Sequence, residues 1–353
     1  MSDVPPEVLV RILSRLPVKS LLQFRSVSKP LHAIIDSPYF VNLHLQQSMK
    51  TDKVLALFRG IGSSTSLCSL YMDSHPTAVE LETPFDRTRF PYVLGSCRGL
   101  ICLSSGPDDR LILLWNPSTR KCKLIPPPIH YSPPAYGDII TIDQVGYDHV
   151  NDDYKVVRLA QCSGPGVNFK VSVYGLKLNM WQLEEQIFPY NFFPVPCSGQ
   201  GLCVSGAVHW LVNQKPGPVM DCLIVALDLA SQRFELVPQP EYSDNYVALD
   251  LGMLGGCLCV VANGEMHNVD VWVMGEYGVK ESWSKLIALT TKNSVMSVFP
   301  SVKPIIYLNN SKEVLLEMNQ RFVSFDLQEK KCKHMRFSDV SHMSAFVYQE
   351  SLV

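Results

Sequence analysis

The sequence predicts two unlike parts: a small all-α unit of three short helices, followed by a large all-β domain for which a six-bladed β-propeller is the best fit. Three observations lead to this fold class. Apolar residues in the first 48 positions follow helical spacing, residues from Lys53 onward alternate with a period of two, and this second part repeats itself. The length of 353 residues, 46% of them hydrophobic, is ample for a folded core. We therefore predict domains at residues 1–48 and 49–353.

The N-terminal part begins with a helix whose apolar residues share one face. Asp3 is placed to cap this helix, Pro5 and Pro6 suit its first turn, and Pro17 ends it. Further helices are expected at residues 20–27 and 31–36, before Pro38 restricts the preceding backbone. Three short helices make a small core, so we expect their apolar surface to need a partner. The apolar face of the first helix consists of Val8, Leu9, Ile12, Leu13 and Leu16.

The second part consists of short β-strands separated by Gly, Pro, Asn and Asp. Clear examples are residues 54–58, 111–115, 171–174 and 269–273, in which β-branched and aromatic residues are frequent. No helical segment longer than about 10 residues stands out here. The pattern therefore indicates an all-β domain.

These strands recur as a unit, and Gly99, Gly206 and Gly256 each open one copy. The mean step between copies is about 51 residues, near the period of a kelch-type propeller blade. The alternative is an irregular two-sheet β fold with coincidental spacing. Residues 345–348 form a candidate strand to close the ring against the first blade. The comparable strand positions are Tyr71, Trp115, Tyr174, Leu227, Trp272 and Phe325.

The charge and composition of the chain exclude some kinds of binding partner and some cellular locations. The formal net charge of −2 argues against a dedicated nucleic-acid or membrane-surface binder. No apolar run is long enough to span a membrane, and the N-terminus lacks the basic and apolar regions of a secretory signal. We therefore expect a cytoplasmic or nuclear protein without membrane insertion, whose 11 cysteines are reduced and mostly buried.

No constellation of catalytic or metal-binding residues stands out. Cys257 and Cys259 lie two apart, but no second Cys or His pair has zinc-ligand spacing. His209, inside a strand, is interpreted as a packed residue, and Asp152 and Asp153 as part of a solvated turn or an Asx turn. We expect no catalytic residue, no cofactor and no metal.

Two Pro-rich, aromatic segments at residues 126–136 and 188–196 are the best candidates for a substrate site. Proline stiffens a loop and lowers the entropy cost of binding, and aromatic side chains make good anchors. The alternative is that these side chains fold back as local core. The candidate substrate-binding residues are Tyr131, Tyr136, Tyr190, Phe192 and Phe193.

Residues 4–29 (VPPEVLVRILSRLPVKSLLQFRSVSK) resemble an F-box. The family's usual Leu and Trp are replaced here by Val4 and Leu31, and the second change removes a large packing anchor. The resemblance implies that the helices dock on a Skp-type adaptor, although some of the matching residues could belong only to the helical core. The implied adaptor contacts are Pro5, Ile12, Leu16, Pro17, Leu21 and Val27.

Most of residues 95–353 resembles the F-box-associated region of plant F-box/kelch-type proteins. The subgroup named for constitutive expression of pathogenesis-related genes is the most similar. The motifs that carry the resemblance are residues 95–102 (GSCRGLIC), 115–120 (WNPSTR), 146–157 (GYDHVNDDYKVV), 208–210 (VHW), 271–285 (VWVMGEYGVKESWSK) and 348–352 (YQESL).

Together these resemblances imply a non-catalytic substrate-recognition subunit of an SCF-type cullin-RING ubiquitin ligase. The adaptor would connect it to a cullin and a RING protein, and the propeller would bind a protein substrate such as an immune regulator or receptor. Two alternatives stay open: a scaffold that binds the adaptor without promoting turnover, and a propeller enzyme or lectin. The second would leave the F-box resemblance unexplained.

Overall fold

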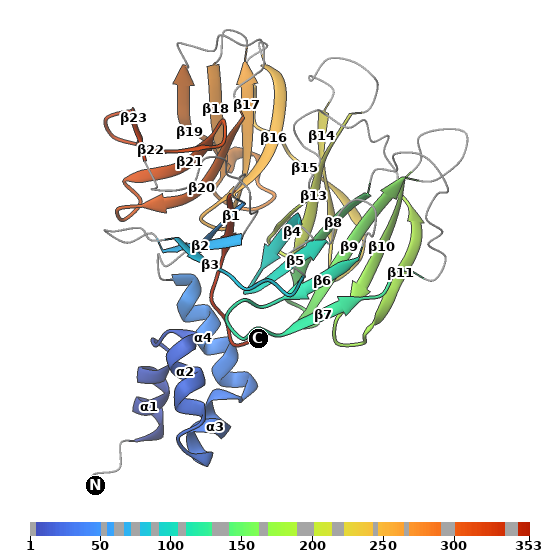
Figure 1. Ribbon diagram of the computed structural model, residues 1–353. Coiled ribbons are helices and arrows are strands. Elements are labelled where there is room, and N and C mark those ends of the chain that lie inside the picture. Colours follow the sequence, from blue (N-terminus) through green and yellow to red (C-terminus); the bar gives the residue numbers. More distant parts are fainter. Residues whose placement is uncertain are drawn as a thin grey trace. The chain divides into compact units, whose positions relative to one another are not determined.

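The computed structural model describes most of the chain as helices, strands and short turns (Figure 1). The chain divides into two compact units, residues 1–126 with 339–353, and residues 127–338. The described residues are 5–50, 55–59, 67–71, 78–85, 92–104, 111–128, 141–161, 169–188, 201–213, 222–242, 246–264, 268–290, 301–335 and 345–353.

The N-terminal part contains four helices, so the expectation of three is wrong. Pro38 begins a new helix instead of ending the helical part, because proline is favoured in a first helical turn and Ser37 caps the helix by accepting a hydrogen bond from the Phe40 amide at 3.2 Å. The boundary at residue 48 stays a prediction. The helices are α1 (Pro6–Leu13), α2 (Val18–Arg25), α3 (Lys29–Ile35) and α4 (Pro38–Lys50).

The helices share a small hydrophobic core that the chain completes from its other end. Leu352, far away in sequence, is 8% exposed and packs within this helical cluster. The need for apolar cover that the sequence indicated is thus met in part by the chain itself. The other buried members are Leu13, Val18, Leu21, Ile35 and Phe40.

The rest of the described chain forms six four-stranded antiparallel sheets, named A to F in chain order. Sheet A combines β24 (Ala345–Tyr348), β1 (Leu55–Arg59), β2 (Leu67–Tyr71) and β3 (Ala78–Glu80). Sheet B combines β4 (Tyr92–Cys97), β5 (Leu100–Ser104), β6 (Ile112–Trp115) and β7 (Cys122–Ile125). Both belong to the first unit.

The second unit contains sheets C to F. Sheet C has β8 (Thr141–Asp148), β9 (Asp153–Gln161), β10 (Phe169–Gly175) and β11 (Met180–Ile187), and sheet D has β12 (Leu202–Val204), β13 (Ala207–Asn213), β14 (Cys222–Asp228) and β15 (Phe234–Val237). Sheet E has β16 (Tyr246–Leu254), β17 (Cys257–Gly264), β18 (Asn268–Met274) and β19 (Trp283–Thr290), and sheet F has β20 (Val302–Leu308), β21 (Glu313–Met318), β22 (Arg321–Asp326) and β23 (Lys331–His334).

The repeat recognised in the sequence corresponds to these sheets. All six comparable positions, from Tyr71 to Phe325, lie on the third strand of their respective sheets. The first strand of sheet A comes from the C-terminal part: β24 pairs antiparallel with β1, Leu55 opposite Tyr348. The predicted pairing of residues 345–348 with the first blade is therefore confirmed.

The glycines that open the repeat copies have a conformational reason to be there. Gly99 and Gly256 are the second residues of two-residue hairpin turns, with φ of +85° and +82°, a region that disfavours side chains. The turns join the first and second strands of sheets B and E. Each repeat copy thus begins at a tight turn.

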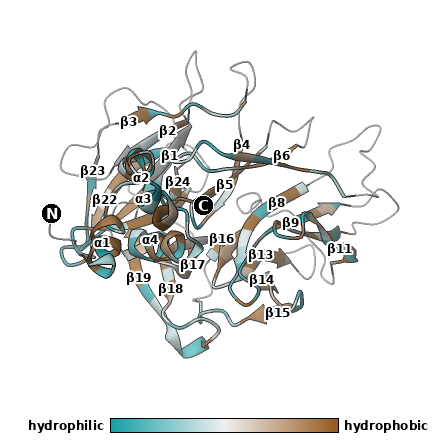
Figure 2. Ribbon diagram, turned by 90° about the horizontal axis from the view of Figure 1, so that it is seen from below, coloured by the Kyte–Doolittle hydropathy of each residue, from teal (hydrophilic) through white to brown (hydrophobic). Residues whose placement is uncertain are grey.

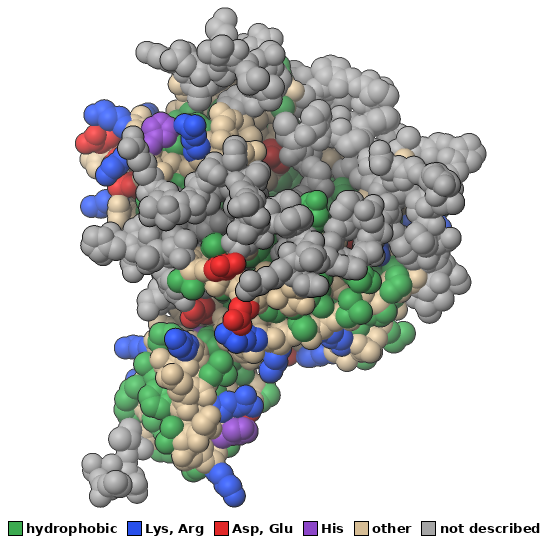
Figure 3. All heavy atoms as spheres, viewed as in Figure 1, with side chains coloured by type: hydrophobic (Ala, Val, Ile, Leu, Met, Phe, Trp, Pro, Cys, Tyr) green, Lys and Arg blue, Asp and Glu red, His purple; other side chains and the backbone are tan. Residues whose placement is uncertain are grey.

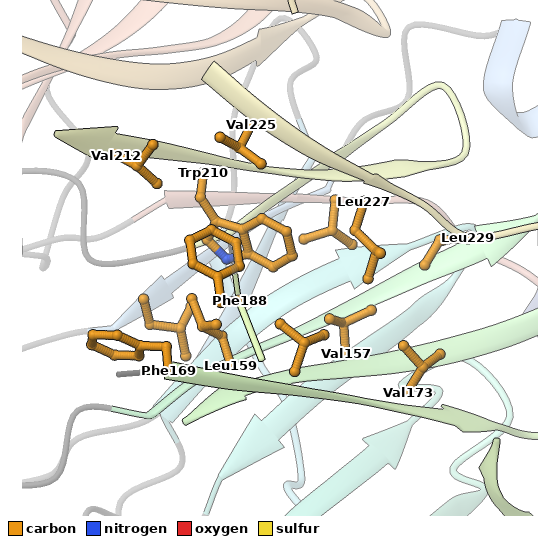
Figure 4. Packing of buried hydrophobic residues seen from close by; sticks show 13 residues of the cluster. Val157, Leu159, Phe169, Val173, Phe188, Trp210, Val212, Val225, Leu227 and Leu229 are labelled. Atoms are coloured by element: carbon orange, nitrogen blue, oxygen red, sulfur yellow. The ribbon is translucent and has the colours of Figure 1, made fainter. Parts of the chain in front are cut away.

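Successive sheets of the second unit pack face to face through apolar side chains, as propeller blades do. Between sheets C and D, Leu159 and Phe169 lie opposite Trp210, with Phe188 against the indole ring (Figure 4). Similar clusters join sheet D to E and sheet E to F. In the first unit, another cluster joins sheets A and B.

Candidate functional site

The helical segment exposes an unusual share of large hydrophobic side chains. Of the sixteen such side chains that are exposed among the described residues, six lie in α1–α4 and the turn after α2. Figure 3 shows hydrophobic atoms (green) on the surface of this segment, beside basic ones (blue). The six are Val8, Ile12, Phe24, Val27, Tyr39 and Met49.

Helix α1 divides its apolar residues between two directions. Leu13 is 4% exposed and Leu9 packs against the helical core, whereas Val8 and Ile12, one turn apart, are 44% and 52% exposed. Figure 2 shows hydrophobic and hydrophilic stretches side by side on these helices. The single apolar face read from the sequence is therefore two faces, one for the core and one for solvent.

The six implied adaptor contacts do not all lie at the surface. Ile12 and Val27 are exposed by 52% and 69%, Pro5 and Pro17 are exposed, and Leu16 is half-buried. Leu21 is a correction: its side chain is fully buried at 0% exposure, so it belongs to the helical core and cannot reach a partner.

Sequence reasoning missed four exposed side chains of the same segment. Val8 was on the predicted helix face and Phe24 within the F-box-like motif, so a finer division of the helix faces could have found both. Tyr39 and Met49 lie on α4, which the sequence reading omitted.

A buried histidine fixes the chain between α1 and α2. His44 of α4 is 2% exposed, and its Nε2 donates a hydrogen bond to the Leu16 carbonyl at 3.0 Å. Burial lowers the pKa of His44 below its usual value, so the ring is neutral near pH 7. This contact positions the Leu16–Pro17 turn that the adaptor prediction includes.

Asn116 joins the helical core to the sheets by holding residues 351–353. Its Nδ2 donates to the carbonyl oxygens of Ser351 and Val353 at 3.0 and 2.9 Å. Its Oδ1 accepts from the amides of Ser118 and Thr119 at 2.8 and 3.1 Å, which fixes the turn after β6. Asn116 is 1% exposed, so these bonds are shielded from water.

Gly99 lies directly against the same segment. A Cβ at this position would come within 2.0 Å of the Ser351 Oγ. The motifs at residues 95–102, 115–120 and 348–352 therefore converge in space, and their glycine, asparagine and serine have a structural explanation. We call residues 349–353 the C-terminal strap.

The acidic motif of sheet C also has structural roles. The side chains of Asp148 and Lys155 form a buried ion pair at 2.8 Å. Burial by itself would raise the pKa of Asp148, but hydrogen bonds from Lys155 and Asn151, together with the charge of Lys155, lower this pKa to about 2. Asp152 lies in an exposed pair with Lys177, as a solvated turn predicts. Asp153 differs: it is 4% exposed and accepts the Lys177 amide at 2.9 Å.

His209 is a packed residue, as predicted. It is 0% exposed, and its ring nitrogens lie 3.1 Å from the Leu202 carbonyl oxygen and 2.7 Å from the Tyr277 hydroxyl. Burial lowers the pKa of His209 to about 4. The imidazole is therefore uncharged near neutral pH, and both of its nitrogens have hydrogen-bond partners within the protein.

Cysteines are free where the structure describes them, but fewer are buried than expected. Cys102, Cys222 and Cys259 are buried, while Cys122 and Cys332 are exposed on the outer strands β7 and β23. Within the described ranges, no group of three or more His, Cys, Asp and Glu side chains is placed to hold a metal ion. In the same ranges no helix is long and apolar enough to cross a membrane.

The predicted substrate-binding residues Tyr131, Tyr136, Tyr190, Phe192 and Phe193 lie outside the described residues. Phe188, which opens the second Pro-rich segment, is described. It is 4% exposed and packs edge-on against Trp210 with ring centroids 5.8 Å apart. At this one position the aromatic residue belongs to the core.

Comparison with known proteins finds two family models along the chain. The F-box domain matches residues 1–43, and the F-box associated beta propeller domain matches residues 65–353. F-box protein CPR1 of Arabidopsis thaliana is 35% identical over 100% of this chain and 89% of its own length. F-box protein At4g22390 of the same plant is 32% identical over 100% and 90%.

A solved structure with a similar course of the chain is the uncharacterized protein lmo1340 from Listeria monocytogenes. It has a TM-score of 0.40 and 10% identity, and covers 83% of this chain and 85% of its own.

Proposed function

Since this chain belongs to the F-box proteins that carry an F-box associated β-propeller domain, we propose that it is the substrate-recognition subunit of an SCF-type cullin-RING ubiquitin ligase. An F-box domain implies binding to a Skp-type adaptor. The adaptor would connect the chain to a cullin and a RING protein. Members of this family are typically non-catalytic, and the ligase would act by holding a substrate lysine near a loaded conjugating enzyme.

One observation carries the adaptor proposal: the apolar side chains that the helices turn to solvent. Val8, Ile12, Phe24 and Val27 are 40% exposed or more and fall within 20 consecutive residues, and apolar exposure concentrated in one part of a protein is typical of an interaction site. Burying such a side chain fully stabilises a complex by about 1.5–3 kcal/mol. We therefore assign adaptor contact to these four, with Pro5, Leu16 and Pro17 at the turns beside them.

The β-part is the proposed substrate receptor, as a six-bladed ring of the kelch type. Six four-stranded sheets and the pairing of β24 with β1 support this arrangement, because joining the first and last strands of the β-part in one sheet is a way to close a propeller. The substrate site is proposed at the two Pro-rich segments that contain Tyr131, Tyr136, Tyr190, Phe192 and Phe193.

The resemblance of the sequence to the subgroup named for constitutive expression of pathogenesis-related genes is our reason to propose an immune regulator or receptor as the substrate, in the cytoplasm or the nucleus of a plant cell. Affinity purification with the proteasome blocked, followed by mass spectrometry, tests this class of substrate. A Phe192→Ala/Phe193→Ala variant should keep the adaptor and lose the substrate. Normal substrate turnover by that variant would contradict the proposed site.

The adaptor proposal is tested by binding of the full chain to a purified Skp-type adaptor. Ile12→Asp should lower the affinity at least about a hundredfold, because it places a carboxylate in an apolar contact. Leu124→Asp is the matched control, since Leu124 on β7 is 55% exposed and Ile12 is 52% exposed. Equal binding by the wild type and Ile12→Asp would overturn the assignment.

A scaffold that binds the adaptor without promoting turnover is the second candidate. Substrate half-life separates the two, measured with the cullin active and inhibited. A receptor requires a longer half-life when the cullin is inhibited and in the Ile12→Asp variant. An unchanged half-life in both would favour the scaffold.

A further inference from the structure

A groove of about 600 Å³ lies between α2 and the turn after β6. One wall is formed by Lys19, Gln23 and Ser26, which are spaced by four and three residues and so share a face of α2 or its end. The other wall is formed by Ser118, Thr119 and Arg120. Both walls belong to the first compact unit, so the groove is defined within that unit alone.

A smaller hollow of about 340 Å³ continues this groove, since Leu22 and Thr119 line both. Arg25 and Lys121 contribute to its lining, as does the strap residue Leu352. The buried Oγ1 of Thr119 and the Nε of Arg25 have no hydrogen-bond partner. Polar atoms of this kind favour a polar occupant, because leaving them unsatisfied costs about 1–3 kcal/mol each.

Positive charge dominates the lining. Lys19 and Lys121 are exposed and form no ion pair with another described residue. Arg120 forms an ion pair with Glu82 at 3.1 Å, but both side chains are at least 75% exposed, so this pair contributes little to stability. A carboxylate of a partner can therefore replace Glu82 beside Arg120. Of the acidic side chains in the lining, Asp36 is neutralised by Arg25 at 2.5 Å, and Glu350 is half-buried.

The charge of the helical part contrasts with that of the whole chain. Residues 1–50 contain six Lys and Arg against three Asp and Glu, whereas the complete sequence has a net charge of −2. Cations concentrated on one surface attract an acidic partner and raise its rate of association, in a way that salt weakens.

Two exposed apolar side chains are next to the groove residues in the chain. Phe24 of α2 and Val27 in the turn after it, which are 40% and 69% exposed, follow the groove residues Gln23 and Ser26. A partner that covers Phe24 and Val27 would therefore lie within a few residues of the groove wall.

We propose that an acidic segment of the adaptor polypeptide lies in this groove, so that the adaptor contacts the first sheets as well as the F-box helices. This inference rests on the proposed function. The carboxylates of the adaptor segment would pair with Lys19, Arg120 and Lys121. Its backbone or side chains would form a hydrogen bond with the Thr119 hydroxyl. The residues 117–121 that follow β6 would thus belong to the adaptor interface.

Calorimetry of the full chain with a purified Skp-type adaptor tests the proposal at about 50 mM and about 300 mM NaCl, which shortens the Debye length from about 14 to about 6 Å. The double variant Lys19→Glu/Lys121→Glu should weaken binding at least about tenfold at low salt, and this loss should shrink at high salt. Lys19 is in the first turn of α2, where an acidic residue is well tolerated, so the helix should stay folded.

The matched control is Lys331→Glu/Lys333→Glu, an equal charge reversal on exposed residues of β23, which should change binding less than about twofold. A photo-crosslinking side chain in place of Gln23 should capture an adaptor peptide rich in Asp and Glu. Wild-type affinity in the groove variant, or capture of a neutral or basic peptide, would overturn the groove assignment while leaving the proposed function standing. No binding by the wild-type chain would overturn both.

Discussion

The helical segment and the sheets of the second unit differ in how they treat surface and interior. In the helices, six large hydrophobic side chains face solvent within residues 5–50, and even the core needs Leu352 from the strap. In sheets C to F, clusters of buried apolar residues are continuous, and charged groups such as Asp148 and Lys155 are buried in pairs.

This difference suggests that the helical segment serves to bind a partner and that the sheets serve as a rigid support. A segment with surplus apolar surface is completed by another chain, whereas sheets that satisfy their own buried groups hold their shape without one. Substitutions inside the sheets should therefore change stability, and substitutions on the helix surface should change binding.

The largest effect on stability is expected for Lys155→Met in sheet C. The change leaves the Asp148 side chain, at 0% exposure, without its cation, at a cost of about 3–5 kcal/mol. Because the pKa of Asp148 is lowered to about 2, the wild-type pair stabilises the fold above about pH 4 and is lost as pH falls toward 2. Urea denaturation at several pH values measures both effects.

Asp148→Asn/Lys155→Met is the control for that experiment, since it removes both charges and should recover much of the lost stability. A Lys155→Met variant as stable as the wild type at pH 7 would contradict the view that sheet C depends on its buried pair.

A pH-dependent loss of about 3 kcal/mol is expected from His209. Its pKa is about 4 in the folded chain and about 6.5 when unfolded, so the unfolded state binds the extra proton as pH falls through this window. Stability due to His209 is therefore full above about pH 6.5 and declines toward pH 4. His209→Gln should flatten the stability curve in that range, and an unchanged slope would refute the assignment.

A difference of about 2 kcal/mol is expected between Gly99→Ala and Gly256→Ala. Both glycines have φ above +80°, so both variants should lose about 1 kcal/mol to backbone strain. Only at Gly99 would the new Cβ collide with Ser351, whereas nothing lies within 4 Å at Gly256. Thermal melting gives the difference.

Displacing the strap in Gly99→Ala should also expose the helical core, because Leu352 packs there. Limited proteolysis should then cut the helices faster in this variant than in Gly256→Ala. Identical melting and cleavage in the two variants would show that the strap does not support the helices.

The smallest stability effect is expected for Val27→Asp, because a side chain that is 69% exposed contributes within about 0.5 kcal/mol to folding. Adaptor affinity should nevertheless fall at least about tenfold. Leu236→Asp on β15, where Leu236 is 54% exposed, should leave both quantities unchanged. A loss of stability in Val27→Asp would make Val27 part of the core rather than the interface.

Much of the fold could be predicted from local pattern. The third-strand positions from Tyr71 to Phe325 and the pairing of residues 345–348 follow from a repeat that is visible in one dimension. The fourth helix was missed because Pro38 has the same local preference after the end of one helix and at the start of the next. Ser37 decides between them through a hydrogen bond that spacing does not reveal.

The candidate site was predicted less completely than the fold. The F-box-like motif located the segment, but not which of its apolar residues face inward: Leu21 is buried and Ile12 is not. Helical periodicity places residues on faces, and it does not say which face another element will cover.

The sequence by itself determined the two-part organisation, the repeated strands and the kind of domain at each end, because these depend on the order of neighbouring residues. Only the tertiary structure decided that residues 99, 116 and 351 meet, that the strap completes the helical core, and that a basic groove opens beside α2. The first two features join segments more than 200 residues apart, and the groove joins α2 to residues 118–120. Such contacts depend on how the sheets and helices pack rather than on any local pattern.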